Sequence, residues 1–227
     1  MGEWLMQDAD LIIKNSSILT MDSKNSILEN GFLVIRGDSI SHMGTGGTPS
    51  IKAANIIDAK GGLVLPGLVN GHTHAAMTLF RGLADDLPLM QWLENYIFPA
   101  ERNMDAEFVH TGTLLALAEM ILSGTTTFCD MYLFEEEVAK AAKKAGVRCL
   151  VGEVLYDFPS PSYGSIAKGF IYTEDLIEKW RKDPLITIAV EPHSPYLCAP
   201  ELLIKAAEIS KQHDIPFIIL FAETQNE

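Results

Sequence analysis

The sequence predicts an α/β protein in which a small β domain precedes a longer series of alternating strands and helices. One observation is a change in apolar periodicity after Gly71, from short β-rich runs to runs at helical spacing. Another is the regular alternation of apolar, strand-like segments with helical segments from there onward. This alternation is typical of a parallel sheet covered by helices, either an open doubly wound sheet or a closed (β/α)8 barrel.

A small, β-sandwich-like domain is expected over residues 1–62, with its remaining strands supplied by a C-terminal segment beyond this chain. Turn signals at Asn30-Gly31 and Gly37-Asp38 separate its strand-forming runs. A Gly-, Thr- and Pro-rich stretch at residues 44–49 precedes a second β-rich part. The runs expected to be strands are residues 11–13, 17–21, 32–36 and 56–59.

The N-terminal part of the barrel is expected over residues 63–227, beginning with a strand at residues 63–69. The clearest helix covers residues 108–122, with Asp105 as N-cap and Gly124 just beyond its end. Further strands are expected at residues 125–131, 147–155, 186–190 and 216–221, and further helices at residues 135–145, 173–182 and 200–212.

A barrel is favoured over a dinucleotide-binding sheet because no Gly-rich phosphate loop follows the first strand of this series. A complete barrel has eight strands and about 250 residues, whereas this chain offers about five βα units. The chain is therefore expected to be truncated at its C-terminus. Its two open sheet edges would make the isolated chain aggregate or oligomerise.

The composition is that of a globular protein, with 48% hydrophobic and 21% charged residues in 227. A net charge of -13 disfavours nucleic acid as a partner. We expect no membrane association, because the chain shows no signal-peptide pattern and no apolar run long enough to span a bilayer. The odd number of cysteines, Cys129, Cys149 and Cys198, is typical of reduced thiols and predicts a cytoplasmic location.

Two histidines, His72 and His74, follow directly on the apolar strand that begins the barrel. Alternate residues of a strand point to the same side, so both imidazoles can face one point at the C-terminal strand end, where barrel enzymes build their active sites. Neutral imidazole is a common zinc or iron ligand. A chance His-x-His pair in a polar loop is the alternative, which the preceding Pro66-Gly67-Leu68-Val69-Asn70 run disfavours.

Short motifs distributed over nearly the whole chain accompany this pair. They are Ala9-Asp10-Leu11-Ile12-Ile13-Lys14-Asn15, residues 66–74 and 77–89, Trp92-Leu93-Glu94, Pro99-Ala100-Glu101, Ser123-Gly124-Thr125-Thr126-Thr127, Pro192-His193-Ser194-Pro195-Tyr196 and Ala222-Glu223-Thr224. With them the chain resembles the amidohydrolase superfamily, and within it the methylthioadenosine/S-adenosylhomocysteine deaminases and their chlorohydrolase relatives. The resemblance implies a (β/α)8 barrel of the metal-dependent hydrolase kind.

The resemblance implies hydrolytic deamination of a small-molecule, adenosine-type nucleoside by metal-activated water. The nucleoside would be S-adenosylhomocysteine, methylthioadenosine or adenosine. The cofactor would be one divalent metal, with zinc favoured and iron as the alternative, and His72 and His74 match two of its ligands. Glu223 matches the carboxylate that shuttles protons. His193 matches a residue that contacts substrate near the reacting centre, and Glu101 matches the carboxylate that binds the ribose hydroxyls.

Each of these side chains also has a structural interpretation. Most glutamates are surface groups, so Glu101 could be a solvated residue at a helix end. His193 could be a hydrogen-bonded structural histidine at the end of a strand. Glu223 ends a strongly apolar strand, where an ionised carboxylate favours a functional role. Asp130 and Glu153, also near strand ends, are assigned only to pocket lining or hydrogen bonding.

Leu220 occupies the position where the resemblance demands a third metal-ligating histidine. A final metal-binding Asp would lie beyond Glu227. Because catalytic zinc usually has at least three protein ligands, this chain is expected to bind metal weakly, which leaves its own activity open. The alternatives are a triazine, pyrimidine or guanine aminohydrolase, a chlorohydrolase of the same superfamily, or an inactive truncated pseudoenzyme. A homo-oligomer is expected only by analogy.

Overall fold

The chain divides into two compact units in a computed structural model that describes residues 8–48 and 50–223. The units comprise residues 1–66 and 67–227, so the division falls after Pro66, slightly later than the boundary suggested by the sequence. In the part of the chain that the structure describes, no helix is long and apolar enough to cross a membrane.

The first unit is a mixed sheet in the order β3-β2-β1-β4, with β5 also paired to β1. β1 runs antiparallel to β2 and parallel to β4 and β5. Ala9, Ile12 and Val34 form a buried cluster in this unit. The two runs expected at residues 11–13 and 17–21 belong to one strand that is irregular near Asn15, where φ is 53°. The strands are β1 (Ala9–Leu19), β2 (Ile27–Arg36), β3 (Ser39–Thr45), β4 (Ala53–Asp58) and β5 (Leu63–Val64).

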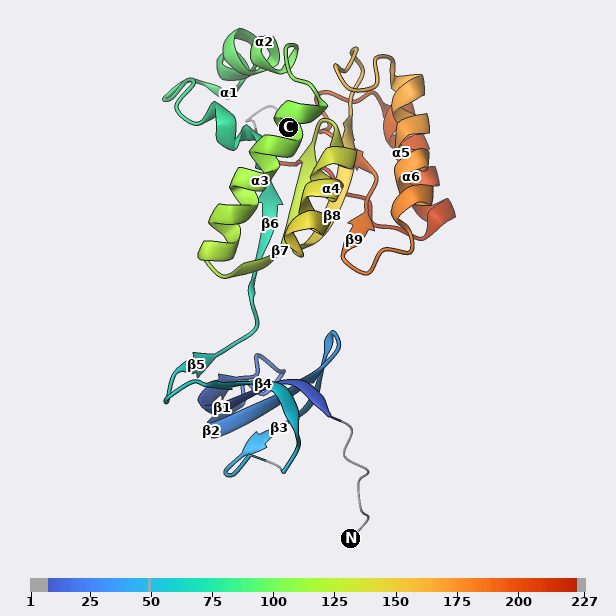
Figure 1. The fold of residues 1–227 in the computed structure, drawn as a ribbon. Helices are drawn as coiled ribbons and strands as arrows, with labels where there is room; N and C mark the ends of the chain where they lie inside the picture. The colour runs from blue at the N-terminus through green and yellow to red at the C-terminus, as the bar shows by residue number, and fades with distance from the viewer. Residues whose placement is uncertain (1–7, 49, 224–227) are drawn as a thin grey trace. The chain divides into compact units, whose positions relative to one another are not determined.

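The second unit is built on a parallel sheet whose strands follow one another in chain order (Figure 1). β6 pairs with β7, β7 with β8, and β8 with both β9 and β10. The strands are β6 (Leu68–Thr73), β7 (Thr125–Tyr132), β8 (Arg148–Leu155), β9 (Ile186–Ile188) and β10 (Glu191–Pro192). The helices between and after them are α3 (Ala106–Leu122), α4 (Glu135–Ala145), α5 (Ile166–Trp180) and α6 (Pro200–His213). This arrangement is that of part of a (β/α)8 barrel, and it confirms the predicted α/β class.

Helix boundaries with strong local signals lie where the sequence placed them. The Asp105 carboxylate accepts a hydrogen bond from the Phe108 amide at 2.9 Å and so caps the start of α3. α4 ends at Ala145 and is followed by Gly146, whose φ of 74° suits a residue without a side chain. α5 was predicted too short, because it begins at Ile166 rather than at residue 173.

The strand expected at residues 216–221 is only partly formed. Phe217 makes a single parallel bridge to Val190, and no regular strand is assigned to this segment of the described chain. The segment nevertheless continues the sheet, because the Val190 amide donates to the Pro216 carbonyl at 2.9 Å and the Leu220 amide donates to the His193 carbonyl at 2.9 Å. It therefore lies beside β10 as the next strand of a barrel would.

The long connection between β6 and α3 contains short helical turns that the sequence did not predict. A 3-10 helix (η1, Ala75–Phe80) follows β6, and a helical segment then runs through α1 (Leu89–Trp92), a π-helical turn (η2, Leu93–Ile97) and α2 (Phe98–Glu101). Such π-helical turns occur frequently at functional sites. This connection carries one wall of the pocket described below.

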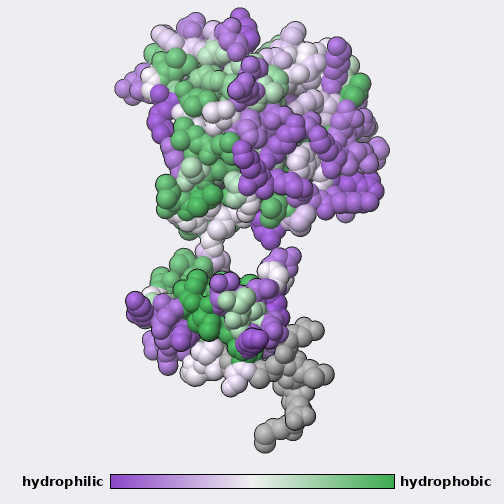
Figure 2. Space-filling model, viewed as in Figure 1, coloured by the Kyte–Doolittle hydropathy of each residue, from purple (hydrophilic) through white to green (hydrophobic). Residues whose placement is uncertain are grey.

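Apolar side chains remain exposed on α3 and β6. Leu122 is 89% exposed and Val69 70% exposed, and Leu68, Leu115 and Ile121 are also exposed. Figure 2 shows hydrophobic residues gathered over α3. β6 is the edge strand of the sheet among the described residues. Unpaired sheet edges invite association with another chain, and we therefore keep self-association of the isolated chain as a prediction.

Candidate active site

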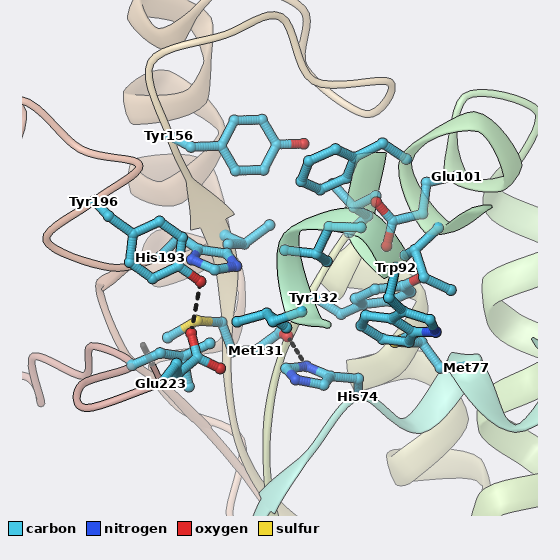
Figure 3. A pocket seen from close by; sticks show the side chains of 17 residues that line it. His74, Met77, Trp92, Glu101, Met131, Tyr132, Tyr156, His193, Tyr196 and Glu223 are labelled. Atoms are coloured by element: carbon cyan, nitrogen blue, oxygen red, sulfur yellow. Dashed lines mark hydrogen bonds between the residues drawn. The ribbon is translucent and has the colours of Figure 1, made fainter. Parts of the chain in front are cut away.

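A pocket lies at the carboxyl ends of the strands of the second unit (Figure 3). Its polar lining consists of His74, Glu101, Tyr132, Tyr156, His193, Tyr196 and Glu223. Glu101 and Glu223 stand on opposite sides of it (Figure 3). The apolar wall includes Met77, Trp92, Phe98 and Leu220. Four of the residues singled out from the sequence, His74, Glu101, His193 and Glu223, are thus brought together with Leu220.

His74 is oriented by a hydrogen bond from its Nδ1 to the carbonyl of Met131, at 2.6 Å. The carbonyl can only accept, so Nδ1 carries the proton and Nε2 keeps its lone pair for a ligand. Burial lowers the pKa of His74 and the hydrogen bond to Met131 raises it. Burial has the larger effect, so the pKa lies below its usual 6.5. A neutral, oriented imidazole is the form that binds metal.

His72 lies next to His74, and the centroids of the two rings are 5.3 Å apart. Its side chain is more exposed and does not contribute to the described pocket lining. Asp130 at the end of β7 accepts a hydrogen bond from the Ala75 amide at 2.6 Å, which fixes the backbone directly after His74. The two imidazoles therefore lie side by side, but only that of His74 lines the pocket, and their joint binding of a metal stays a prediction.

The donor set in residues 8–48 and 50–223 does not fit a catalytic zinc site. No group of three or more His, Cys, Asp or Glu in this part of the chain could hold a metal ion. Leu220 stands in the pocket wall, and its hydrocarbon side chain has no atom that can coordinate a metal. A metal on His72 and His74 would therefore need at least one further ligand from outside the described residues.

Tyr196, His193 and Glu223 form the wall opposite Glu101. The Tyr196 hydroxyl donates to Glu223 Oε2 at 2.8 Å. The His193 and Tyr196 rings lie edge to face with their centroids 5.8 Å apart. Glu223 is close enough to His74 for its negative charge to act on the His74 pKa. Thr224, which completes the Ala-Glu-Thr motif, lies outside the described residues.

Glu101, at the end of α2, lines the pocket rather than extending into bulk solvent. Burial raises its pKa from 4.5 to about 7, and a hydrogen bond from the Tyr132 hydroxyl partly opposes this shift. The same hydroxyl lies 3.5 Å from the Met104 sulfur. The carboxyl group can thus change its charge near neutral pH while it faces the pocket.

The sequence did not identify Tyr132, Tyr156 or Trp92 as pocket residues. Tyr132 and Tyr156 stand at the ends of β7 and β8, and this position could have indicated that they line the pocket. Aromatic residues at strand ends are equally typical of a core, however. Asp130 and Glu153 do make hydrogen bonds, but both are fully buried and neither contributes to the described pocket lining.

Glu153 fixes the loop that follows β8. α4 begins after Phe134, whose side chain cannot cap a helix, and Glu153 instead accepts from the amides of Phe134 at 3.3 Å and Glu135 at 2.9 Å. It also accepts a hydrogen bond from the Ser162 hydroxyl. Burial raises the pKa of Glu153 from 4.5 to about 7, although these hydrogen bonds favour the charged form. The carboxyl group thereby joins the β8 loop to the start of α4.

Glu153→Ala is expected to lower the free energy of unfolding by about 2–6 kcal/mol, because one buried and one partly buried amide lose their acceptor at about 1–3 kcal/mol each. Denaturant unfolding would measure the change. Glu153→Gln is the matched control, since its single amide oxygen can still accept from one of the two amides, and it should lose less than the alanine variant. Equal stability of the alanine variant and the unsubstituted protein would contradict this role.

The chain is similar in sequence to known proteins. The model of the amidohydrolase family matches residues 63–227. The 5-methylthioadenosine/S-adenosylhomocysteine deaminase of Syntrophobacter fumaroxidans is 54% identical over 96% of this chain and 50% of its own length. A relative of the same name from Syntrophus aciditrophicus is 51% identical over 98% of this chain and 51% of its own length. The chain thus spans about half the length of the curated relatives it matches.

Solved structures show the same fold. An adenosine deaminase from Xanthomonas campestris with bound zinc superimposes with a TM-score of 0.94 and 35% identity, covering 98% of this chain and 51% of that one. A triazine hydrolase from Arthobacter aurescens superimposes with a TM-score of 0.86 and 19% identity, covering 95% and 53%. The second likeness concerns the fold alone.

Proposed function

We propose, because the chain belongs to the amidohydrolase family, that the protein containing it is a hydrolytic deaminase of adenosine-type nucleosides. The substrates would be S-adenosylhomocysteine, methylthioadenosine or adenosine. The observation that carries the proposal is the pocket with Glu101 on one side and Glu223 and His193 on the other. The names of the relatives, two of them methylthioadenosine/S-adenosylhomocysteine deaminases, support it.

The pocket offers different chemistry to the two ends of a nucleoside. Glu101 in its charged form can accept hydrogen bonds from two neighbouring ribose hydroxyls. Trp92 and Tyr132 offer flat apolar surfaces to a planar ligand. On the opposite wall, His193 and Glu223 would stand beside the reacting carbon and ring nitrogen of the base. This distribution favours a ribosyl substrate over a free base.

Glu223 is proposed to move the proton between the attacking water and the ring nitrogen. The Tyr196 hydroxyl donates to one oxygen of this carboxylate at 2.8 Å and so helps to fix its orientation. His193 would contact the substrate next to the bond that breaks. A divalent metal, zinc in preference to iron, would be held by His72 and His74 together with ligands from outside the described residues.

Two other functions are considered. A triazine, pyrimidine or guanine aminohydrolase, or a chlorohydrolase, would use the same fold, but Glu101 would then have no ribose to bind. A pseudoenzyme is favoured by Leu220 alone, because a leucine cannot coordinate a metal. The cytoplasmic location, the homo-oligomer and the exclusion of nucleic acid and membrane partners stay predictions.

The direct test is release of ammonia from the three nucleosides by the purified protein with added zinc, alongside its metal content by inductively coupled plasma mass spectrometry. Guanine, a triazine and a pyrimidine serve as comparison substrates. Release from nucleosides in preference to these compounds is the expected result. Release only from a free base or a triazine would refute the proposal, and no release with metal far below one per chain would favour the pseudoenzyme.

Nucleoside affinity is expected to rise with pH through about 7, where Glu101 loses its proton and becomes able to accept two ribose hydroxyls. A protonated Glu101 offers a weaker acceptor, so affinity should fall below that pH and level off above it. Dissociation constants for adenosine from about pH 6 to about pH 8.5 would show the change. Glu101→Gln should remove this step in the profile. Adenine, which has no ribose, is the matched ligand and should show no step that depends on Glu101.

A further inference from the structure

Two hydrogen bonds join the segment after β6 to the end of β7. His74 Nδ1 donates to the Met131 carbonyl at 2.6 Å (Figure 3), and the Ala75 amide donates to the Asp130 carboxylate, also at 2.6 Å. The regular pairing of the two strands ends at Thr73 and Asp130. These two bonds therefore hold His74 in place beyond the last paired residues of the strands.

Asp130 has a second partner in Glu135, the first residue of α4. Their carboxyl groups are hydrogen-bonded to each other, and both residues are fully buried. In residues 8–48 and 50–223, no other group makes a hydrogen bond to Asp130 Oδ2 or to either Glu135 side-chain oxygen. Because two carboxylates can only accept, a hydrogen bond between them requires that one carries a proton.

The proton of this pair lies on Glu135. Burial raises the pKa of Glu135 well above its usual 4.5, and the negative charge of Asp130 raises it further. Burial also raises the pKa of Asp130, to about 7, but the hydrogen bonds from Glu135 and from the Ala75 amide oppose this shift. Glu135 is therefore the donor in the pair, and Asp130 is the acceptor.

The surroundings of Glu135 disfavour loss of this proton. Glu153 and Glu191 are also fully buried, and their charges raise the Glu135 pKa further. None of these buried carboxyl groups forms a salt bridge among the described residues, so no cation compensates for an ionised Glu135. The start of α4 does not require the Glu135 side chain, because Glu153 already accepts from the first amides of this helix.

We propose that Glu135 is a positioning residue for His74, and that it acts by donating a hydrogen bond to Asp130. Asp130 in turn holds the Ala75 amide, and this amide fixes the backbone directly after His74. A carboxylate held from two sides has less freedom to turn away from the amide than one held from a single side. The inference rests on the proposed function, in which the position of His74 matters for the reaction.

The first test is hydrogen exchange at the Ala75 amide in the chain without added metal or substrate. Mass spectrometry with electron-transfer fragmentation resolves single amides and tolerates an oligomer. Glu135→Leu, similar in size but without a donor, should speed this exchange about 10-fold relative to that at Cys149. The Cys149 amide donates to the Leu185 carbonyl at 3.0 Å near the start of β8 and reports general destabilisation. Glu135→Gln keeps a donor and should restore slow exchange.

Infrared spectroscopy tests the protonation of Glu135 directly. The unsubstituted protein at neutral pH should show a carboxylic acid C=O band that Glu135→Gln lacks, because glutamine has no carboxyl group. Glu136→Gln is the matched control: it removes the next carboxylate of α4, which is paired with Lys140 and Lys179, and should leave both the band and the Ala75 exchange unchanged. An equal band in the unsubstituted protein and in Glu135→Gln would overturn the inference, even if Glu135→Leu failed to fold.

Equal relative exchange at Ala75 in Glu135→Leu and the unsubstituted protein would overturn it as well, as would fast exchange in Glu135→Gln. If the protein deaminates nucleosides, Glu135→Leu should lower kcat roughly 10-fold to 100-fold, the usual cost of removing a group that orients a site residue. An unchanged kcat would refute the role for His74 and leave the deaminase proposal intact. If no nucleoside is deaminated, the deaminase proposal fails, and the exchange at Ala75 decides the role of Glu135 separately.

Discussion

Leu220→His is expected to raise the affinity for zinc roughly 100-fold, because it adds a third imidazole to His72 and His74. A four-ligand zinc site contributes about 10–16 kcal/mol, so one ligand accounts for about 3 kcal/mol if the ligands share equally. Leu220 lines the same pocket as His74, and its amide is anchored to the His193 carbonyl at 2.9 Å. The substitution should therefore change the side chain without moving the backbone at position 220.

Zinc affinity would be measured by competition with a chelating indicator. Leu115→His is the matched control, because it places the same new side chain at a partly exposed position of α3 outside the pocket. Only the Leu220 variant should bind zinc more tightly. Equal affinities in the two variants would show that position 220 does not face the metal, and the family-based assignment of a third ligand there would be wrong.

Glu223→Gln is expected to lower kcat for deamination by about 10²–10⁴-fold, the usual contribution of a positioned general acid/base. Glutamine has nearly the same shape and can still accept from the Tyr196 hydroxyl, but it cannot take up a proton. Substrate binding should change much less than kcat.

The measurement is kcat at saturating zinc, in the natural sequence and in a Leu220→His background. Tyr196→Phe separates orientation from proton transfer, since it removes the hydrogen bond to Glu223 but keeps the Glu223 carboxylate, and it should lower kcat about 10-fold. A glutamine variant that keeps most of its kcat would assign proton transfer to another group, with His193 as the next candidate.

Elements with strong local signals could be predicted from the sequence. The Asp105 cap and Gly146 terminator fix the ends of α3 and α4 through groups only a few residues apart. α5 was misplaced because Gly164 and Gly169 suggest a loop, whereas burial of Phe170 against the core stabilises the extra turns. Residues 216–221 have the composition of a strand, but pairing with a neighbour decides how much regular strand forms.

In the candidate site, some residues could be identified from the sequence, whereas their contacts and burial could not. The His-x-His spacing after an apolar strand identified His72 and His74 from the sequence, and the resemblance identified Glu101, His193, Leu220 and Glu223 as positions to examine. Only the tertiary structure shows that the Tyr196 hydroxyl donates to Glu223 and that burial raises the pKa of Glu101. These features join side chains from distant parts of the chain. They depend on which strand ends become neighbours and on how deeply each group is buried, which no local pattern of residues encodes.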